Sequence, residues 1–146
     1  MNPDDPDAAL DLGLCWLDLR RWDDAFPLLA RAARAPRAAA RAWAGLGDLW
    51  ASKGDIRRSI ACYEAALARD SAQFAVVRKL ARQYLSLGST AKAQGLYDAA
   101  LSRLDKTLAA LRANPAAADP HTAAFALRLR AQLSAGKDAI VRSAGR

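Results

Sequence analysis

The sequence predicts an all-α fold made of repeated helix pairs, and three observations support that prediction. Much of the 53% hydrophobic fraction is alanine, which favours helix and lets helices approach closely, while β-branched residues are few. Apolar residues recur at helical spacing along most of the chain. A pattern of aromatic, leucine and small residues also returns about every 34 residues, which is typical of stacked helical repeats.

The first helix pair is expected over about residues 6–39. Asp7 and the prolines around it supply the start signal for a helix that runs from residue 7 to about 19. Its apolar positions recur at helical spacing and predict the buried face: Ala9, Leu12, Cys15, Trp16 and Leu19. A second helix follows over about residues 23–33. The chain then breaks at Pro36.

The second pair, over about residues 40–73, shows the repeat most clearly. Gly54 suits the left-handed position after a helix, and Asp55 suits the cap of the next one, so these two residues separate the helices of the pair. Gly47 is expected to let the two helices approach closely, with the bulky side chain of Tyr63 filling the space beside it.

The third pair, over about residues 74–113, is expected to have an unusually long second helix. Gly88 marks the turn between its helices, and the second helix starts near Thr90. No breaker follows, and leucines continue its apolar face to Ala113, about two turns further than in the other pairs.

Residues 114–146 are expected to form a degenerate fourth repeat or a capping helix pair. A helix over about residues 121–135 would bury an apolar stripe of Phe125, Leu129 and Leu133. Gly136 would end it, and one more short helix would follow. Such a pair would cover the apolar face that a stack of repeats leaves open at its end.

Similar residues align when the sequence is compared with itself after a shift of one period. Trp50 then falls over Trp16 and Tyr84, which predicts that these three aromatic side chains belong to the core. The other matching columns are Leu12, Leu46 and Leu80, then Gly13, Gly47 and Ala81, then Ala32, Ala66 and Ala100. These columns resemble the tetratricopeptide repeat (TPR), in which two antiparallel helices form each unit. The resemblance covers about residues 6–105 and implies a right-handed α-solenoid, with residues 1–146 as a single TPR-like domain.

The resemblance also implies a protein–protein interaction scaffold, with no enzyme activity and no cofactor, that binds a peptide or partner helix in a concave groove. The positions that face this groove in the family are here Leu10, Asp11, Leu14, Leu17 and Asp18 in the first pair, Arg41 and Asp48 in the second, and Arg78, Lys79, Arg82 and Leu85 in the third. One end of this groove would be acidic and the other basic. An acidic segment of the ligand would then lie over Arg78, Lys79 and Arg82, and a basic segment near Asp11, Asp18 and Asp48. The alternative is a solvated face whose charges serve solubility alone.

One known binding mode of the family is not expected here. A well-known subset holds the C-terminal carboxylate of chaperone tails with lysines, asparagines and an arginine. The equivalent positions are occupied here by Leu10, Leu14, Gly45, Ala75 and Lys79. Only the last is basic, so this chain should not bind such tails by that mechanism.

The net charge of +7 is spread unevenly along the chain. It is −2 over residues 1–39, +1 over 40–73, +5 over 74–113 and +3 over 114–146. Basic charge alone gives weak, salt-sensitive binding to nucleic acid, and no nucleic-acid module accompanies it, so that class of partner is disfavoured. No apolar run could span a membrane and no secretion signal is present, so we expect a cytoplasmic protein without a membrane partner.

Catalysis and metal binding have little support. His121 is the single histidine and lies at an expected helix start, and the sequence holds no phosphate-binding loop and no cluster with metal-ligand spacing. Cys15 and Cys62 lie inside the helical pattern without a nearby partner, so both are expected to be buried free thiols.

Two further hypotheses stay open. The array could be the recognition or regulatory segment of a larger enzyme, such as a transferase, whose catalytic part lies outside this chain. Asn2 and Pro3 stand where a proline commonly closes the preceding unit, so Met1 is expected to fall inside a longer array. The other hypothesis is self-association into a homo-oligomer through leucines of the long helix or of the final helices.

Overall fold

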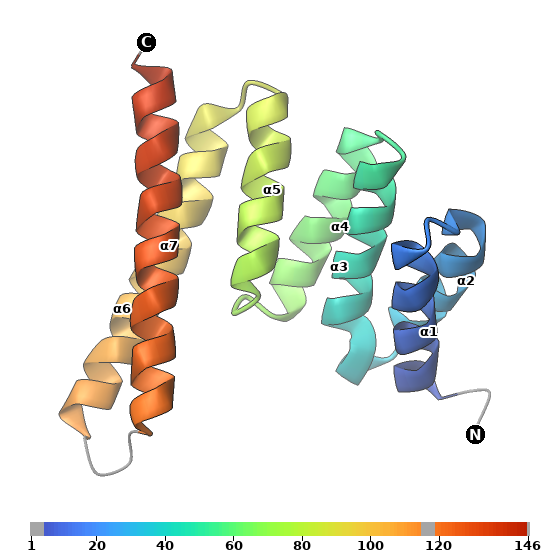
Figure 1. Cartoon of the computed structure of the whole chain (residues 1–146), viewed down its shortest axis with the longest axis horizontal. Helices are drawn as coiled ribbons and strands as arrows, with labels where there is room; N and C mark the ends of the chain where they lie inside the picture. The colour runs from blue at the N-terminus through green and yellow to red at the C-terminus, as the bar shows by residue number, and fades with distance from the viewer. Residues whose placement is uncertain (1–4, 115–118, 146) are drawn as a thin grey trace. The chain divides into compact units, whose positions relative to one another are not determined.

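The structure, a computed structural model, describes residues 5–114 and 119–145 and is all α over that part of the chain. The helices are α1 (Pro6–Asp18), α2 (Trp22–Ala32), α3 (Pro36–Ser52), α4 (Ile56–Arg69), α5 (Phe74–Ser86), α6 (Thr90–Ala113) and α7 (Pro120–Ala144) (Figure 1). The chain divides into two compact units, the first ending at Gln83 and the second beginning at Tyr84. The predicted all-α fold is confirmed, whereas a single domain over residues 1–146 stays a prediction.

In the first unit, α1 packs on α2 and α3 packs on α4, and α3 also packs on both helices of the first pair. Figure 1 shows these four helices as two neighbouring hairpins. Their core consists of small and medium side chains: Ala9, Leu10, Ala25, Leu29, Ala32, Ala38, Ala42, Leu46, Leu49 and Cys62. Because alanine side chains are short, the helices can approach closely while the leucines fill the space between them.

The first helix of each pair ends in the same backbone motif. The residue that follows the C-cap is left-handed, with φ of 57° at Arg20, 78° at Gly54 and 71° at Gly88. The next residue donates its N–H to a carbonyl five positions back, at 2.8 Å for Trp16, 2.9 Å for Trp50 and 2.8 Å for Tyr84. This pairing satisfies carbonyls at the helix end that would otherwise lack a partner. Its recurrence shows that the sequence repeat is also a structural repeat.

The aromatic side chains at these positions have similar surroundings in each pair. Trp16 and Trp50 are half-buried against the core, and Tyr84 is buried. A cation lies over each ring: Arg21 at 4.2 Å from the centroid of Trp16, Arg58 at 4.5 Å from that of Trp50, and Lys92 at 5.3 Å from that of Tyr84. These contacts add electrostatic attraction to the apolar packing of the rings.

Gly47 of α3 faces the aromatic ring of Tyr63 of α4, as predicted. A Cβ atom at Gly47 would lie 2.4 Å from two ring carbons of Tyr63, which is far inside van der Waals contact. Tyr63 is itself among the largest fully buried side chains. The absence of a side chain at Gly47 therefore sets how closely these two helices approach.

The buried face of α1 differs from the predicted one. Leu12 and Leu19 were expected inside but are 48% and 66% exposed, while Leu10 and Gly13 are buried. The reason is that α1 contacts both α2 and α3, so its buried face is centred between these two neighbours. Spacing along one helix cannot show where a second neighbour will lie.

The prediction for the two cysteines is half right. Both are free, but only Cys62 is buried, while Cys15 is exposed. Burial raises the pKa of the Cys62 thiol to about 11, and the nearby carboxylate of Asp55 adds to the rise.

In the second unit, α6 and α7 pack against each other. The predicted length of α6 is confirmed, since this helix has 24 residues against 14 in α4. Ion pairs join the two helices on their exposed sides, between Asp105 and Arg130 and between Asp98 and Lys137.

The predicted helix break at Gly136 is wrong, because α7 runs without interruption from Pro120 to Ala144. A Cβ atom at Gly136 would lie 2.9 Å from the hydroxyl oxygen of Tyr97 on α6. The glycine thus allows a close helix contact, and the packing gained there outweighs the roughly 1 kcal/mol that glycine costs in a helix.

The buried face of α7 also differs from the expected stripe. It consists of Ala126, Leu133 and Ile140, whereas Phe125 is 67% exposed. Of the three predicted stripe residues, Leu133 is buried, Leu129 is half-buried and Phe125 is exposed. Residues 120–144 form one long helix where a pair was predicted.

Candidate functional site

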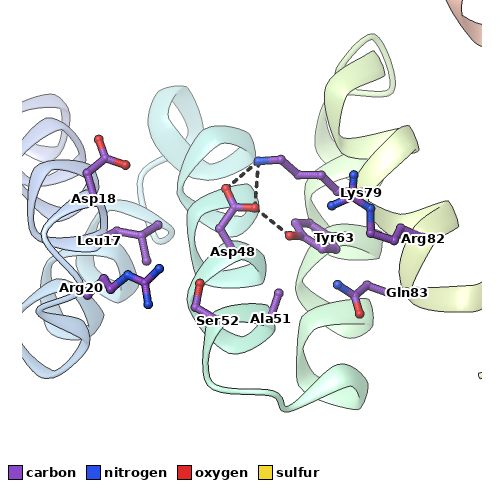
Figure 2. A pocket seen from close by; sticks show the side chains of 10 residues that line it. All are labelled: Leu17, Asp18, Arg20, Asp48, Ala51, Ser52, Tyr63, Lys79, Arg82 and Gln83. Carbon is purple, nitrogen blue, oxygen red and sulfur yellow. Dashed lines mark hydrogen bonds and ion pairs between the residues drawn. The ribbon is translucent and has the colours of Figure 1, made fainter. Parts of the chain in front are cut away.

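A pocket of about 620 Å³ lies in the first unit (Figure 2). Most of its wall comes from α1, α3 and α5, the first helices of the three pairs, together with the turn after α1. The lining residues are Leu17, Asp18, Arg20, Asp48, Ala51, Ser52, Tyr63, Lys79, Arg82 and Gln83. The pocket is therefore formed by the helices that the family resemblance places on the groove side.

The repeat explains why these side chains meet. Leu17 and Ala51 occupy the same position in consecutive pairs, as do Asp18 and Ser52. Asp48 and Arg82 are likewise one period apart, so equivalent positions of neighbouring pairs contribute to one wall because the pairs share one backbone arrangement.

Asp48 is the centre of a hydrogen-bond network in the pocket. Its carboxylate accepts hydrogen bonds from the hydroxyl of Tyr63 at 2.6 Å and from Nζ of Lys79 at 2.8 and 2.7 Å. Figure 2 shows Asp48 on α3 with dashed lines to both Tyr63 and Lys79. The network connects three helices, so it fixes the shape of this part of the pocket.

Tyr63 stays protonated in this network. Burial is the largest cause that raises the pKa of its phenol, followed by the hydrogen bond to Asp48, while the positive charge of Arg82 opposes the rise. The hydroxyl is therefore a hydrogen-bond donor throughout the physiological pH range.

Several predicted groove charges pair with each other. Asp48 and Lys79 were expected to contact opposite parts of a ligand, but they form an ion pair at 2.7 Å. Asp11 and Arg41 likewise form an exposed ion pair at 3.7 Å. These charges largely cancel, so the groove is less polarised than residue counting suggests.

The other predicted residues divide between the pocket and elsewhere. Leu17, Asp18 and Arg82 line the pocket. Leu10 is only 1% exposed and belongs to the core, so it has no surface to offer a ligand. Leu14 is half-buried and packs against Gly45 of α3.

Arg78 and Leu85 are exposed on α5 and are not among the lining residues of the pocket. Leu85 belongs to the second unit, which begins at Tyr84. The structure therefore gives neither side chain a place in the pocket wall.

Sequence reasoning missed Arg20, Tyr63 and Gln83 as pocket residues. Tyr63 was assigned only to helix packing, which is also correct, but its hydroxyl reaches the pocket wall. Arg20 lies in a turn, where a helix-face pattern has no meaning. The sequence signal for Arg20 was that it stands in a turn position where the next repeat has a glycine, Gly54.

The second unit has a smaller pocket of about 380 Å³. It is lined by Asp105, Leu108, Arg112, Leu127 and Arg130. The carboxylate of Asp105 accepts a hydrogen bond from Nε of Arg130 in its wall, so these two charges are already satisfied.

Metal-binding clusters and membrane-spanning helices are both absent from the described residues, 5–114 and 119–145. No three histidine, cysteine, aspartate or glutamate side chains there lie close enough to hold a metal ion. None of the helices there is both long and apolar enough to cross a membrane.

Solved structures with a similar fold share little sequence with the chain. PcrH from Pseudomonas aeruginosa aligns over 97% of this chain and 95% of its own, with 22% identity and a TM-score of 0.67. PilF from Pseudomonas aeruginosa aligns over 97% and 68%, with 16% identity and a TM-score of 0.64. A MamA protein aligns over 97% and 74%, with 20% identity and a TM-score of 0.61. These likenesses establish the fold.

No curated protein sequence is significantly similar to the chain. A family model described as tetratricopeptide repeat, however, matches residues 1–38, 17–73 and 51–107 in three overlapping registers. The matches agree with the recurring helix ends and aromatic contacts described above, and the chain belongs to the tetratricopeptide repeat family.

Proposed function

We propose that the chain is an interaction scaffold that binds a peptide or a helix of a partner protein in the pocket of its first unit. Repeats of this family are scaffolds for protein–protein interaction in general. The observation that supports the specific site is the pocket of about 620 Å³, whose wall comes mainly from the first helices of consecutive pairs.

The chemistry of the wall favours a polypeptide ligand over an apolar small molecule. Pockets for small molecules are lined mainly by hydrophobic and aromatic side chains. This wall has two aliphatic side chains, Leu17 and Ala51, and otherwise presents charged, amide and hydroxyl groups. A peptide offers that same mixture of short apolar and polar groups.

A substitution that fills the pocket tests this proposal. Ala51 is half-buried on α3 and lines the pocket, so Ala51→Trp should block it. Ala68→Trp adds the same side chain at an exposed position of α4 outside the pocket and is the matched control. Circular dichroism shows whether both variants keep the helical fold.

The ligands for this test are peptides selected from a random library displayed on phage. We expect selected peptides to bind the unchanged chain and Ala68→Trp equally, and to lose at least tenfold in affinity for Ala51→Trp, because the indole occupies their site. If Ala51→Trp, still folded, binds every selected peptide as well as the unchanged chain does, the pocket is not the binding site.

A further inference from the structure

Two arginines in the pocket wall form no ion pair within the described part of the chain. Of the charged side chains that line the pocket, Asp48 and Lys79 neutralise each other. Arg20 and Arg82 take part in no ion pair with any described residue. Guanidinium groups are strong, forked hydrogen-bond donors, and these two face a space large enough for a ligand group.

Arg20 is held in a backbone conformation that an arginine does not favour. Its φ is 57°, and the corresponding turns of the other two pairs have glycine, at Gly54 and Gly88. A side chain in the left-handed region costs free energy that glycine avoids. The structural contacts of this turn are made by Arg21, which lies over Trp16 and pairs with Asp24. The arginine at position 20 is therefore unexplained by the turn itself.

The two arginines lie on opposite sides of the pocket. Figure 2 shows Arg20 beside Leu17 at the end of α1, and Arg82 on α5, with Ala51 and Ser52 of α3 between them. An anionic group placed between the two walls could accept hydrogen bonds from both guanidinium groups. Leu17 and Ala51 would then meet the apolar part of a neighbouring side chain.

The charge balance of the wall favours an anion with a single negative charge. Against Arg20, Lys79 and Arg82, the same wall carries the carboxylates of Asp18 and Asp48. These carboxylates would repel a phosphate dianion or a nucleic-acid backbone. One carboxylate of a peptide side chain matches the remaining positive charge.

We infer that Arg20 and Arg82 together bind the side-chain carboxylate of an aspartate or glutamate in the partner, next to an aliphatic residue that packs on Leu17 and Ala51. This inference rests on the proposed function of the same pocket. It replaces the expected basic patch of Arg78, Lys79 and Arg82 with a pair of arginines that face each other across the pocket.

The test uses peptides selected on the intact chain as above, each then synthesised with its acidic residue as Glu or as Gln. Binding is measured by fluorescence anisotropy to the unchanged chain and to Arg20→Gly and Arg82→Gln. The matched control is Arg57→Gln, which removes one positive charge at an exposed position of α4 outside the pocket.

We expect Arg20→Gly and Arg82→Gln each to weaken binding of the Glu peptide about fivefold to tenfold, because each removes charge-assisted hydrogen bonds at a partly solvated site. The Gln peptide should bind the unchanged chain with a similar loss and be insensitive to either substitution. Arg57→Gln should leave the affinity unchanged. Arg20→Gly suits the turn, so it should unfold no more easily than the unchanged chain and its weaker binding cannot be attributed to misfolding.

Three outcomes would overturn the inference, and they are distinguishable. If Ala51→Trp abolishes binding while Arg20→Gly and Arg82→Gln keep full affinity, or if the selected peptides contain no acidic residue, the pocket binds peptides without using the arginines. If Ala51→Trp leaves the binding of every peptide intact, the proposed function fails as well.

Discussion

Replacing Gly47 by alanine should destabilise the chain, although alanine is the better helix former. The new Cβ would lie 2.4 Å from two ring carbons of Tyr63. The ring cannot easily move away, since Tyr63 is 2% exposed and its hydroxyl donates a 2.6 Å hydrogen bond to Asp48. Either the helices separate or the ring leaves its place in the core.

The magnitude follows from two opposing effects. Overpacking of a core costs about 1–3 kcal/mol, and a contact this short belongs at the upper end of that range. Helix propensity returns about 1 kcal/mol. We therefore expect a net loss of about 2 kcal/mol in the free energy of unfolding. Gly95→Ala is the matched control, because a Cβ atom added at this position of α6 would have no other side chain within 4 Å.

The assay is urea unfolding followed by circular dichroism, with the slope of each transition compared among variants. Gly95→Ala should raise stability by about 0.5–1 kcal/mol, since only the helix propensity of alanine acts there. The reasoning is refuted if Gly47→Ala is as stable as the unchanged chain, or if both alanine variants shift stability in the same direction.

Two other predictions concern a turn and the thiols. Arg20→Gly should raise the free energy of unfolding by about 0.5 kcal/mol. The substitution relieves about 1 kcal/mol of left-handed strain, but glycine also increases the conformational entropy of the unfolded chain, which offsets part of that gain. A lower urea midpoint would contradict this. In native buffer, a thiol reagent should modify exposed Cys15 quickly and Cys62 only on unfolding, and equal rates would count against the described packing. Burial raises the pKa of Cys62 to about 11, above its unfolded value of about 8.5. The contribution of this thiol to stability should therefore be complete below about pH 8.5 and decline as the pH rises toward about 11. Unfolding of Cys62→Ala at alkaline pH checks this, since the variant should lack that decline.

The repeat and its turns could be predicted because they depend on local chemistry. Glycine at positions 54 and 88 permits the left-handed backbone that ends a helix, and this requirement holds whatever packs nearby. The carboxylate of Asp55 accepts a hydrogen bond from the N–H of Arg58 at 3.0 Å, as its position before a helix predicts. Short-range rules therefore placed most helix boundaries correctly.

The failed predictions share a dependence on neighbours that are distant in sequence. Leu12 and Leu19 have the spacing of buried residues, but the position of α3 decides which side of α1 is covered. Gly136 has the local signature of a helix end, yet its contact with Tyr97 on α6 keeps it inside a helix. In both cases long-range packing overrode a local preference.

By itself, the sequence determined the family and the period, because a repeat places equivalent side chains in equivalent surroundings. Only the tertiary structure decided which charges are available to a ligand. The carboxylate of Asp48 and the ammonium group of Lys79 lie 31 residues apart in sequence and 2.7 Å apart in space, so their attraction is satisfied within the protein. Coulomb energy depends on that distance in space, so of the cations in the pocket wall Lys79 is neutralised, while Arg20 and Arg82 form no ion pair with a described residue.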